Sequence, residues 1–221
     1  MAFHRIAVEH WARKEHYEHF MQEVVCSYSM TADLDITRLK GQRLYPAMLW
    51  LLTDTVQAIP EFRTAATEEG LGVYDGMTPA YTVFHQQTKT FSCLWTAFSE
   101  DYPTFLKAYE ADLEAYGTDV HYIAKPGRPA NSFDVSVLPW ACFTGFHLNI
   151  AGDGKYLLPI FTIGRKFERD GRLYLPLAIQ VHHAVCDGYH ICLFVNTLQE
   201  KIERFPACGR QADGSAGGGQ R

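Results

Sequence analysis

The sequence predicts an α+β fold in which helices pack on a mixed, largely antiparallel sheet. Three observations support this prediction: apolar residues recur at helical spacing in some segments, alternate with polar residues in others, and two strand-like segments meet at a hairpin turn. Helical and strand-like segments are interleaved along the chain, as in proteins whose helices cover a sheet. Of the 221 residues, 47% are hydrophobic and 14% are aromatic, so the chain can bury a large core.

The first sixty residues predict two helices with a strand between them. Apolar side chains recur at helical spacing over residues 11–25, which predicts an amphipathic helix. Residues 26–37 alternate apolar and polar side chains, as a half-buried strand does. A second helix is expected from Pro46 to Ile59, and Pro60 ends it. This second helix is apolar nearly all round and should therefore be buried.

The rest of the chain is richer in strands. Strands are expected within residues 71–98, followed by a helix over residues 104–116. Three β-rich stretches then follow, at residues 133–150, 156–167 and 172–183. Asp170 and Gly171 suit a hairpin turn between the last two of these stretches. Residues 188–204 place apolar side chains along one face and predict the final helix.

We expect a single domain over residues 1–207 and a flexible C-terminal tail over residues 208–221. The end of the tail is rich in glycine and contains no side chains that could form a core. No internal repeat and no linker-like stretch divides the part of the sequence before it.

The bulk composition predicts a soluble, cytoplasmic protein that binds neither nucleic acid nor membranes. The formal net charge is −5, whereas a nucleic-acid-binding face is usually basic. The longest apolar stretch, residues 47–52, is too short to span a bilayer, and the N-terminus lacks the pattern of a signal peptide. The six cysteines include no C-x-x-C pair, which suits reduced, buried thiols.

The most informative stretch is the run from His182 to Gly188, with the sequence HHAVCDG. It joins an apolar strand-like segment to the final helix and puts an imidazole at a strand end beside a tight turn. Histidine can take up and return a proton near neutral pH, so this position suits a general base. Strand alternation places His182 and His183 on opposite faces, so only one of them can serve a given site. The spacing alone does not say which one.

Several roles remain open at this motif. Asp187 can orient a histidine base as the carboxylate of a triad, or it can fix the turn as an ion-pair partner. Metal binding through His182, His183, Asp187 and His190 is disfavoured, because ligand pairs are usually spaced to share one face. Cys186, flanked by apolar residues, is typical of a small buried side chain rather than a nucleophile. The chain contains no nucleotide-binding glycine motif and no G-x-S-x-G motif.

Read from Gln180 to His190, the motif resembles the active-site segment of the chloramphenicol acetyltransferase family. Further blocks agree with that family in order and spacing, namely Trp11–Tyr17, Leu34–Thr37, Tyr45–Pro46, Tyr81–His85, Val135–Trp140 and Phe161–Gly164. The likeness extends from around residue 3 to residue 205. It implies a two-layer α/β sandwich and a homotrimer with active sites at the subunit interfaces. The implied reaction moves an acetyl group from acetyl-CoA, a co-substrate, to the 3-hydroxyl of chloramphenicol, with no permanently bound cofactor.

The resemblance also implies roles for individual residues. His183 would be the base that deprotonates the acceptor hydroxyl directly, without an acyl-enzyme. Ser136 would stabilise the oxyanion that forms on the thioester carbonyl, and Thr162 would assist through a bound water. Asp187 would be structural and would pair with Arg13. The open question about Asp187 is thereby answered against a proton-relay triad, as an implication of the family.

Two sets of binding residues follow from the same likeness. The acceptor pocket would be aromatic and apolar, lined by Phe20, Val24, Tyr28, Leu148 and Ile160. The phosphates and adenine of CoA would contact Arg43, Arg165, Lys166 and Phe167. Ordinary core packing for the first set, and a solvated charge cluster for the second, are the alternative interpretations. No metal ligand is implied.

The chain departs from the family pattern at three places. The segment between Thr37 and Tyr45 is shorter than the usual family loop, and His147 stands where Asn or Asp is common. At His19 and Phe20 the chain lacks a tyrosine that some members have. These departures leave acetyl transfer as the expected reaction. They also keep an alternative open, which is the same chemistry on a different hydroxyl or thiol acceptor.

Overall fold

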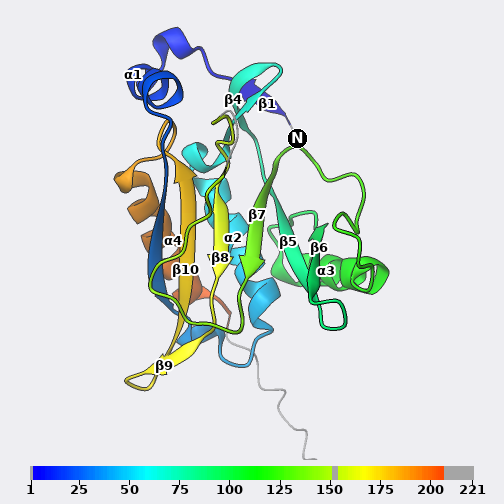
Figure 1. Cartoon of the computed structure of the whole chain (residues 1–221). Coiled ribbons are helices and arrows are strands. Elements are labelled where there is room, and N and C mark those ends of the chain that lie inside the picture. The colour runs from blue at the N-terminus through cyan, green and yellow to red at the C-terminus, as the bar shows by residue number, and fades with distance from the viewer. Residues whose placement is uncertain (1, 151–153, 207–221) are drawn as a thin grey trace, which may run out of the picture.

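The computed structural model describes residues 2–150 and 154–206, and Figure 1 shows the path of the chain. The strands are β1 (Phe3–Arg5), β2 (Ser27–Asp35), β3 (Thr64–Thr67), β4 (Gly70–Tyr74), β5 (Thr78–His85), β6 (Thr90–Trp95), β7 (Ser132–Val137), β8 (Ile160–Ile163), β9 (Phe167–Arg169) and β10 (Arg172–His182). The α-helices are α1 (Lys14–Glu18), α2 (Leu44–Ala58), α3 (Tyr102–Tyr116) and α4 (Gly188–Arg204). Short 3₁₀ or π-helical turns add η1 (Val8–His10), η2 (His19–Glu23), η3 (Thr37–Leu39) and η4 (Pro60–Arg63).

The main sheet is mixed and largely antiparallel, as the sequence predicts. Its strands lie in the order β2, β10, β8, β7, β5 and β6, and β9 pairs with β10. Strand β7 runs parallel to both β5 and β8, whereas the remaining pairs are antiparallel. Strands β1, β4 and β3 form a separate antiparallel sheet that the sequence did not predict. The strands expected within residues 71–98 are therefore divided between two sheets.

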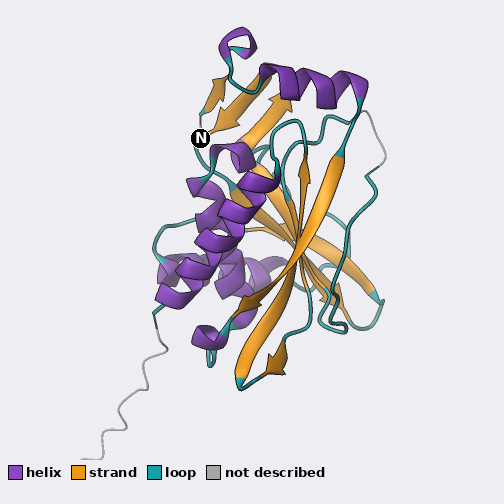
Figure 2. Cartoon of the chain, turned by 90° about the vertical axis from the view of Figure 1, so that its left-hand side faces the viewer, coloured by secondary structure: helices purple, strands orange, loops and turns teal. Residues whose placement is uncertain are grey.

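The helices and the loops cover different faces of the main sheet. Helices α2, α3 and α4 pack on one face, as Figure 2 shows. Residues 138–150 run over the opposite face, where the Leu148 amide donates a hydrogen bond to the Gln180 side chain over 2.7 Å. The predicted layer of helices on a sheet is thus present, and the loop-covered face is left free of helices.

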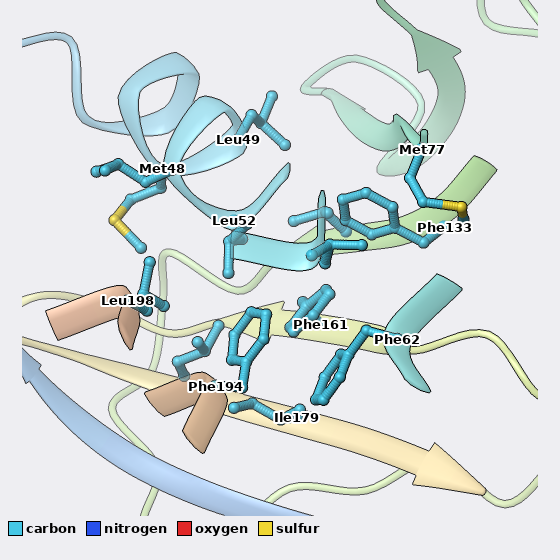
Figure 3. Close-up of a cluster of buried hydrophobic side chains, with 14 of the residues drawn as sticks. Met48, Leu49, Leu52, Phe62, Met77, Phe133, Phe161, Ile179, Phe194 and Leu198 are labelled. Atoms are coloured by element: carbon cyan, nitrogen blue, oxygen red, sulfur yellow. The ribbon is translucent and has the colours of Figure 1, made fainter. Parts of the chain in front are cut away.

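The core lies between the sheet and the helices (Figure 3). Phe161 of β8 and Ile179 of β10 are fully buried against Phe194 of α4, and Phe62 stacks on Phe194 with ring centroids 4.6 Å apart. Truncating one such buried ring to alanine costs about 3–5 kcal/mol. Side chains alternate along a strand. Because Phe161 faces the helices, its neighbour Thr162 points to the opposite face of the sheet.

Most predicted helices are present with small shifts at their ends. Helix α4 begins and ends at the predicted residues, 188 and 204. Helix α2 begins at Leu44 rather than Pro46. Helix α3 begins at Tyr102, because the side chain of Asp101 accepts a hydrogen bond from the Thr104 amide and caps the first turn. The predicted helix over residues 11–25 is shorter and consists of α1 continued by the π-helical turn η2.

Two predictions about the later strands have different outcomes. Asp170 and Gly171 form the turn between β9 and β10, and both have positive φ, 51° and 75°, as the predicted hairpin turn requires. The β-rich stretch predicted over residues 133–150 is wrong after Val137, where β7 ends. Pro139 follows at once and has no amide to donate to a neighbouring strand, so the chain leaves the sheet there. The predicted tail over residues 208–221 lies outside the described residues.

Candidate active site

The turn after β10 carries His183 at the end of the pair formed by β10 and the edge strand β2. The His183 amide donates to the Cys26 carbonyl over 2.8 Å, which extends the pairing of β10 with β2 by one residue. The amides of Val185 and Cys186 then donate to the His182 carbonyl over 3.2 and 3.0 Å. Both residues are buried, so the turn packs against the core. The backbone that carries His183 is therefore anchored on both sides.

The imidazole of His183 lies against two aromatic rings. The ring of Phe20 stacks on it with centroids 4.0 Å apart and planes 5° apart, and Tyr28 lies 5.1 Å away. Tyr28 pairs with Val181 across β2 and β10, so it faces the same side of the sheet as His183. The Nδ1 atom of His183 is buried and has no hydrogen-bond partner among the described residues. Stacking thus fixes the plane of the ring, whereas its in-plane position depends on the backbone.

The carboxylate of Asp187 pairs with Arg13 and not with the imidazole of His183. Nη1 of Arg13 donates to Oδ2 of Asp187 over 2.8 Å, and Nη2 donates to the His183 carbonyl over 3.4 Å. Burial acts to raise the pKa of Asp187, but the hydrogen bond from Arg13 and the charges of His190 and Arg13 outweigh it and lower the pKa. The carboxylate is therefore ionised at neutral pH. This geometry fits the ion-pair interpretation of Asp187 rather than the triad.

His182 is a packed residue on the other face of β10. Only 2% of its surface is exposed, and its Nδ1 accepts a hydrogen bond from the Ala184 amide over 3.2 Å. Burial, together with the neighbouring His183, lowers the pKa of His182, so this ring stays neutral at physiological pH. The two adjacent histidines therefore occupy different environments, as the strand alternation predicts.

Ser136 and Thr162 lie side by side on the sheet face that carries no helices. Strands β7 and β8 pair Ser136 with Thr162, and β8 and β10 pair Thr162 with Ala178. Both residues open into a cavity of about 470 Å³. Its lining is mostly apolar and aromatic and consists of Thr82, Phe84, Lys89, Phe91, Ser136, Val137, Leu138, Pro139, Trp140, Phe146, Leu148 and Thr162. We call this the serine cavity; its size and lining suit a small aromatic ligand.

Within one chain His183 does not reach the serine cavity. Ala178, the neighbour of Thr162, lies five residues before His183 on β10. That separation is roughly 17 Å along the strand at about 3.4 Å per residue. The two sites also face opposite sides of the sheet, because side chains alternate. The structure therefore brings His183 together with Phe20 and Tyr28, and Ser136 together with Thr162, but it keeps the two groups apart.

The five predicted acceptor-pocket residues divide between these two places. Three belong to the segment that passes the histidine, namely Phe20 of η2, Val24 directly after it, and Tyr28 of β2. The other two lie on the serine side of the sheet, although Leu148 also lines a third cavity, of about 260 Å³, together with Tyr28. Leu148 lines the serine cavity, whereas Ile160 is buried on β8, faces the same way as Thr162 and is not part of the lining. No single chain assembles the whole predicted acceptor pocket.

A second cavity of about 240 Å³ adjoins the serine cavity. Val137 and Pro139 line both cavities, so the two meet at the end of β7. Two of the predicted CoA residues, Arg165 and Lys166, line this second cavity beside apolar side chains. We call it the basic cavity after these two residues. Leu44, Tyr45 and Met48 of α2 also line it, so it lies on the helix-covered side of the sheet.

The other two predicted CoA residues lie outside this lining. The guanidinium of Arg43 pairs with Glu110 of α3 and sits 5.9 Å above the Tyr109 ring. The ring of Phe167 stacks on Tyr174 across the β9–β10 hairpin, with centroids 5.8 Å apart. Both side chains have protein partners that a ligand would have to share or replace.

Sequence reasoning missed the aromatic lining of the serine cavity. Phe84 and Phe91 face each other across β5 and β6, and Trp140 packs edge-on against Phe84 with centroids 4.7 Å apart. The exposed fractions are 39% for Phe84, 49% for Phe91 and 58% for Trp140, which is high for large apolar side chains. An aromatic pair at solvent-facing positions of a predicted hairpin is the signal that could have found them.

The described part of the chain has neither a metal-binding cluster nor a membrane-spanning helix. In residues 2–150 and 154–206, no group of three or more His, Cys, Asp or Glu side chains is arranged to hold a metal ion. Over the same residues, no helix combines the length and the apolarity needed to cross a bilayer. The five cysteines that the structure describes are all free thiols.

Comparison with known proteins identifies close relatives by sequence. A family model described as chloramphenicol acetyltransferase matches residues 1–199. A chloramphenicol acetyltransferase from Clostridium perfringens is 50% identical over 205 residues, which are 91% of this chain and 99% of the relative. The enzyme of that name from Clostridioides difficile is also 50% identical, covering 94% of this chain and 100% of its own length. One from Campylobacter coli is 47% identical, covering 92% of this chain and 100% of the relative.

Solved structures match in fold at lower sequence identity. A chloramphenicol acetyltransferase matches with a TM-score of 0.79 at 21% identity, over 91% of this chain and 100% of that chain. A dihydrolipoamide acetyltransferase of Azotobacter vinelandii matches with a TM-score of 0.59 at 18% identity, over 80% of this chain and 81% of that chain. Both share the arrangement of sheet and helices described above.

Proposed function

The chain belongs to the chloramphenicol acetyltransferase family, and we propose that it transfers the acetyl group of acetyl-CoA to the 3-hydroxyl of chloramphenicol. Relatives that are 50% identical over nearly the whole chain carry that name. The observation that supports the proposal best is the ring-stacked His183 in the HHAVCDG turn, together with a serine-bearing aromatic cavity. Acetylation would inactivate the antibiotic, so we expect the protein to confer resistance.

In the proposed mechanism, His183 acts as general base. Its imidazole accepts the proton of the acceptor hydroxyl while the oxygen attacks the thioester carbonyl carbon. Ser136 donates a hydrogen bond to the oxyanion that forms, and Thr162 assists through a water; such a donor contributes about 2.7–4 kcal/mol. The carbon–sulfur bond then breaks, and His183 returns the proton to the CoA thiolate. The products are the acetyl ester and CoA, and no acyl-enzyme forms.

We further propose that the reaction takes place between subunits of a homotrimer. The separation of His183 from the serine cavity supports this, because one chain alone cannot present both groups to one substrate. One subunit would contribute the base and the three predicted acceptor residues beside it. Its neighbour would contribute Ser136, Thr162 and the serine cavity. Three-fold closure follows from the family resemblance, and a closed ring is the usual outcome of such a head-to-tail contact.

For acetyl-CoA we propose the second cavity, which adjoins the serine cavity. The phosphates of CoA would lie near Arg165 and Lys166, which line it. Arg43 would help only if it exchanges Glu110 for a phosphate, and Phe167 would offer a ring to adenine at the edge of the β9–β10 hairpin. Joining the two cavities at Val137 and Pro139 would bring the thioester to Ser136.

The same chemistry on another hydroxyl or thiol acceptor is the second candidate. It is favoured by the ring that stacks on His183, because Phe20 carries no hydroxyl to bind a polar acceptor group. Three features would alter the choice of acceptor, namely Phe20, His147 and the short segment after Thr37. They leave the base, the serine and the basic cavity in place.

We propose that the protein works in the cytoplasm as one acetyltransferase domain. The free thiols at Cys26, Cys93, Cys142, Cys186 and Cys192 suit a reducing compartment. The cytoplasm also supplies acetyl-CoA, the proposed co-substrate.

The proposal is tested by incubating the purified protein with acetyl-CoA and chloramphenicol and following release of the CoA thiol spectrophotometrically. We expect saturable thiol release that depends on chloramphenicol, with formation of the 3-acetyl ester shown by mass spectrometry. Release with other alcohols or dihydrolipoamide, but not with chloramphenicol at saturating concentrations, would favour the second candidate. Chloramphenicol lacking a free 3-hydroxyl serves as the control acceptor.

A further inference from the structure

A chain of polar contacts runs from η4 to the backbone of His183. Oε1 of Glu61 lies 3.5 Å from Nε2 of His190. On the other side of that ring, Nδ1 of His190 lies 2.9 Å from Oδ1 of Asp187, whose second oxygen accepts from Arg13. Arg13 in turn donates to the His183 carbonyl. The contacts join residues from η4, α4, the turn and the segment before α1.

We propose that His190 and Glu61 are positioning residues for His183, acting on it through Asp187 and Arg13. The inference rests on the proposed function, because it assumes that His183 is the base. Neither Glu61 nor His190 has a part in the mechanism above, and neither lines the serine cavity or the adjoining basic cavity. They would act by holding the turn and would touch no substrate.

The ring of His190 is placed to bridge its two acidic neighbours in either protonation state. Its side chain is 12% exposed, and that of Glu61 is 27% exposed. In the neutral ring, Nδ1 accepts a hydrogen bond from the Asp187 amide, 3.2 Å away, and the Nε2 hydrogen faces Glu61. In the protonated ring, Nδ1 donates to the Asp187 carboxylate instead. The bridge therefore needs a side chain with two polar atoms on opposite sides.

This bridge controls the in-plane position of the His183 imidazole. Phe20 fixes the plane of that ring by stacking, but the ring has no hydrogen bond at Nδ1 to stop it from sliding within the plane. The remaining constraint is the backbone, which is held at the His183 amide by the Cys26 carbonyl and at the His183 carbonyl by Arg13. If Asp187 moves, Arg13 moves with it. A displacement of about 1 Å at a reacting group can reduce the rate by roughly 100-fold.

Simple stabilisation of α4 is the alternative role, because His190 also forms a capping box with Asp187 at the start of that helix. Lys201 offers a matched control on the same helix. Its Nζ donates to the Asp54 carboxylate over 2.6 Å and to the Asp54 carbonyl over 2.8 Å, which ties α4 to α2. Breaking that tie loosens α4 without touching the turn that carries His183.

The test compares Glu61→Gln, His190→Asn and His190→Gln with Lys201→Met in the full-length protein. Asparagine keeps a polar atom near the Nδ1 position and glutamine keeps one near Nε2, so each preserves one half of the bridge. We expect kcat to fall roughly 10- to 100-fold in each of the three bridge variants, with both KM values within about twofold of wild type. Lys201→Met should lower the thermal midpoint and leave kcat unchanged.

The double variant Glu61→Gln/His190→Asn sharpens the result. If the two residues act as one unit, the double variant should be no slower than the slower single variant. Equal kcat losses in Lys201→Met and the bridge variants, or unchanged kcat in Glu61→Gln, would overturn the proposal. Glu61→Gln is nearly isosteric and lies at the edge of the network, so it keeps the test valid even if the His190 variants fold poorly.

A readout without turnover separates this proposal from the proposed function. In protein labelled with ¹⁵N in its histidine rings, the His183 signals can be assigned by their loss in His183→Asn. We expect these signals to shift or broaden in Glu61→Gln and in His190→Asn, and to stay unchanged in Lys201→Met. Unchanged His183 signals in the bridge variants would contradict the positioning role. If the signals move but wild-type protein releases no CoA thiol, the positioning contact stands and the proposed reaction fails.

Discussion

The turn that carries His183 and the serine cavity are built in opposite ways. The turn is held by charged and hydrogen-bonding side chains of Arg13, Asp187 and His190, and the histidine itself stacks in a fixed plane. The cavity is lined by large rings, and Trp140 among them is 58% exposed. A base has to be held in one position, whereas a pocket for a bulky acceptor has to admit it. Changes in the turn should therefore act mainly on kcat, and changes in the aromatic lining of the cavity mainly on KM.

The largest effect is expected on the turn side. His183→Asn should lower kcat roughly 10²- to 10⁴-fold, because the amide cannot accept the hydroxyl proton, while KM for acetyl-CoA changes little. Steady-state thiol release at saturating substrates measures this. His182→Asn is the matched control and should retain far more activity. Equal losses in the two variants would remove the distinction between the packed and the reacting histidine.

Ser136→Ala comes next, and it tests a cavity residue that we expect to act on kcat. Loss of the donor to the oxyanion should lower kcat roughly 10²- to 10³-fold without a matching rise in KM. Ser29→Ala is a suitable control, because its hydroxyl donates to Gln180 across β2 and β10 and does not line the cavity. If Ser136→Ala changed only KM for the acceptor, the serine would bind substrate and would not stabilise the transition state.

The aromatic lining should show the opposite behaviour. Phe91→Ala removes a half-exposed ring from the serine cavity and should raise KM for chloramphenicol about 10-fold, in line with the loss of roughly 1.5 kcal/mol of apolar contact. Its kcat at saturation should stay within about threefold of wild type. Initial rates over a range of chloramphenicol concentrations separate the two parameters. A loss confined to kcat would break the division between turn and cavity.

The smallest effect concerns stability and its dependence on pH. The pKa of Asp187 is lowered in the fold, so its ion pair stabilises the protein above the ordinary carboxyl pKa of about 4 and is lost as the pH falls through the lowered value. Because the Asp187 side chain is 32% exposed, solvent screening reduces the contribution to about 1 kcal/mol. Asp187→Asn should therefore lower the thermal midpoint at pH 7, and the difference from wild type should shrink toward pH 3. A difference that grows on acidification would show that the pKa of Asp187 is raised instead.

The turn could be predicted well from the sequence because its residues are contiguous. The amphipathic pattern of residues 188–204 predicts α4, and strand alternation separates His182 from His183. The serine cavity draws on β5, β6, β7, β8 and the loop after β7, so local patterns could not reveal its aromatic lining. The end of β7 was missed because residues after Pro139 keep a strand-like composition although they leave the sheet.

Local sequence patterns could not predict contacts between residues that lie far apart in the chain. The pairing of Glu61 with His190 depends on η4 packing beside the start of α4, and nothing in either segment alone indicates it. The sheet of β1, β4 and β3 was not predicted for a similar reason, since its strands are short and its pairing is partly non-local. The pairing of Arg13 with Asp187 came only from the family resemblance, and the geometry described here agrees with it.

The proposal that the reaction takes place between subunits can be tested by mixing two impaired variants. His183→Asn and Ser136→Ala are each expected to be nearly inactive alone. If the base and the serine come from neighbouring subunits, co-refolding equal amounts should restore about one quarter of the wild-type sites, by random assembly of a closed ring. Thiol release by the mixture would then greatly exceed the mean of the two variants. If the mixture gave no more than that mean, although subunits demonstrably exchange, His183 and Ser136 could not act across an interface.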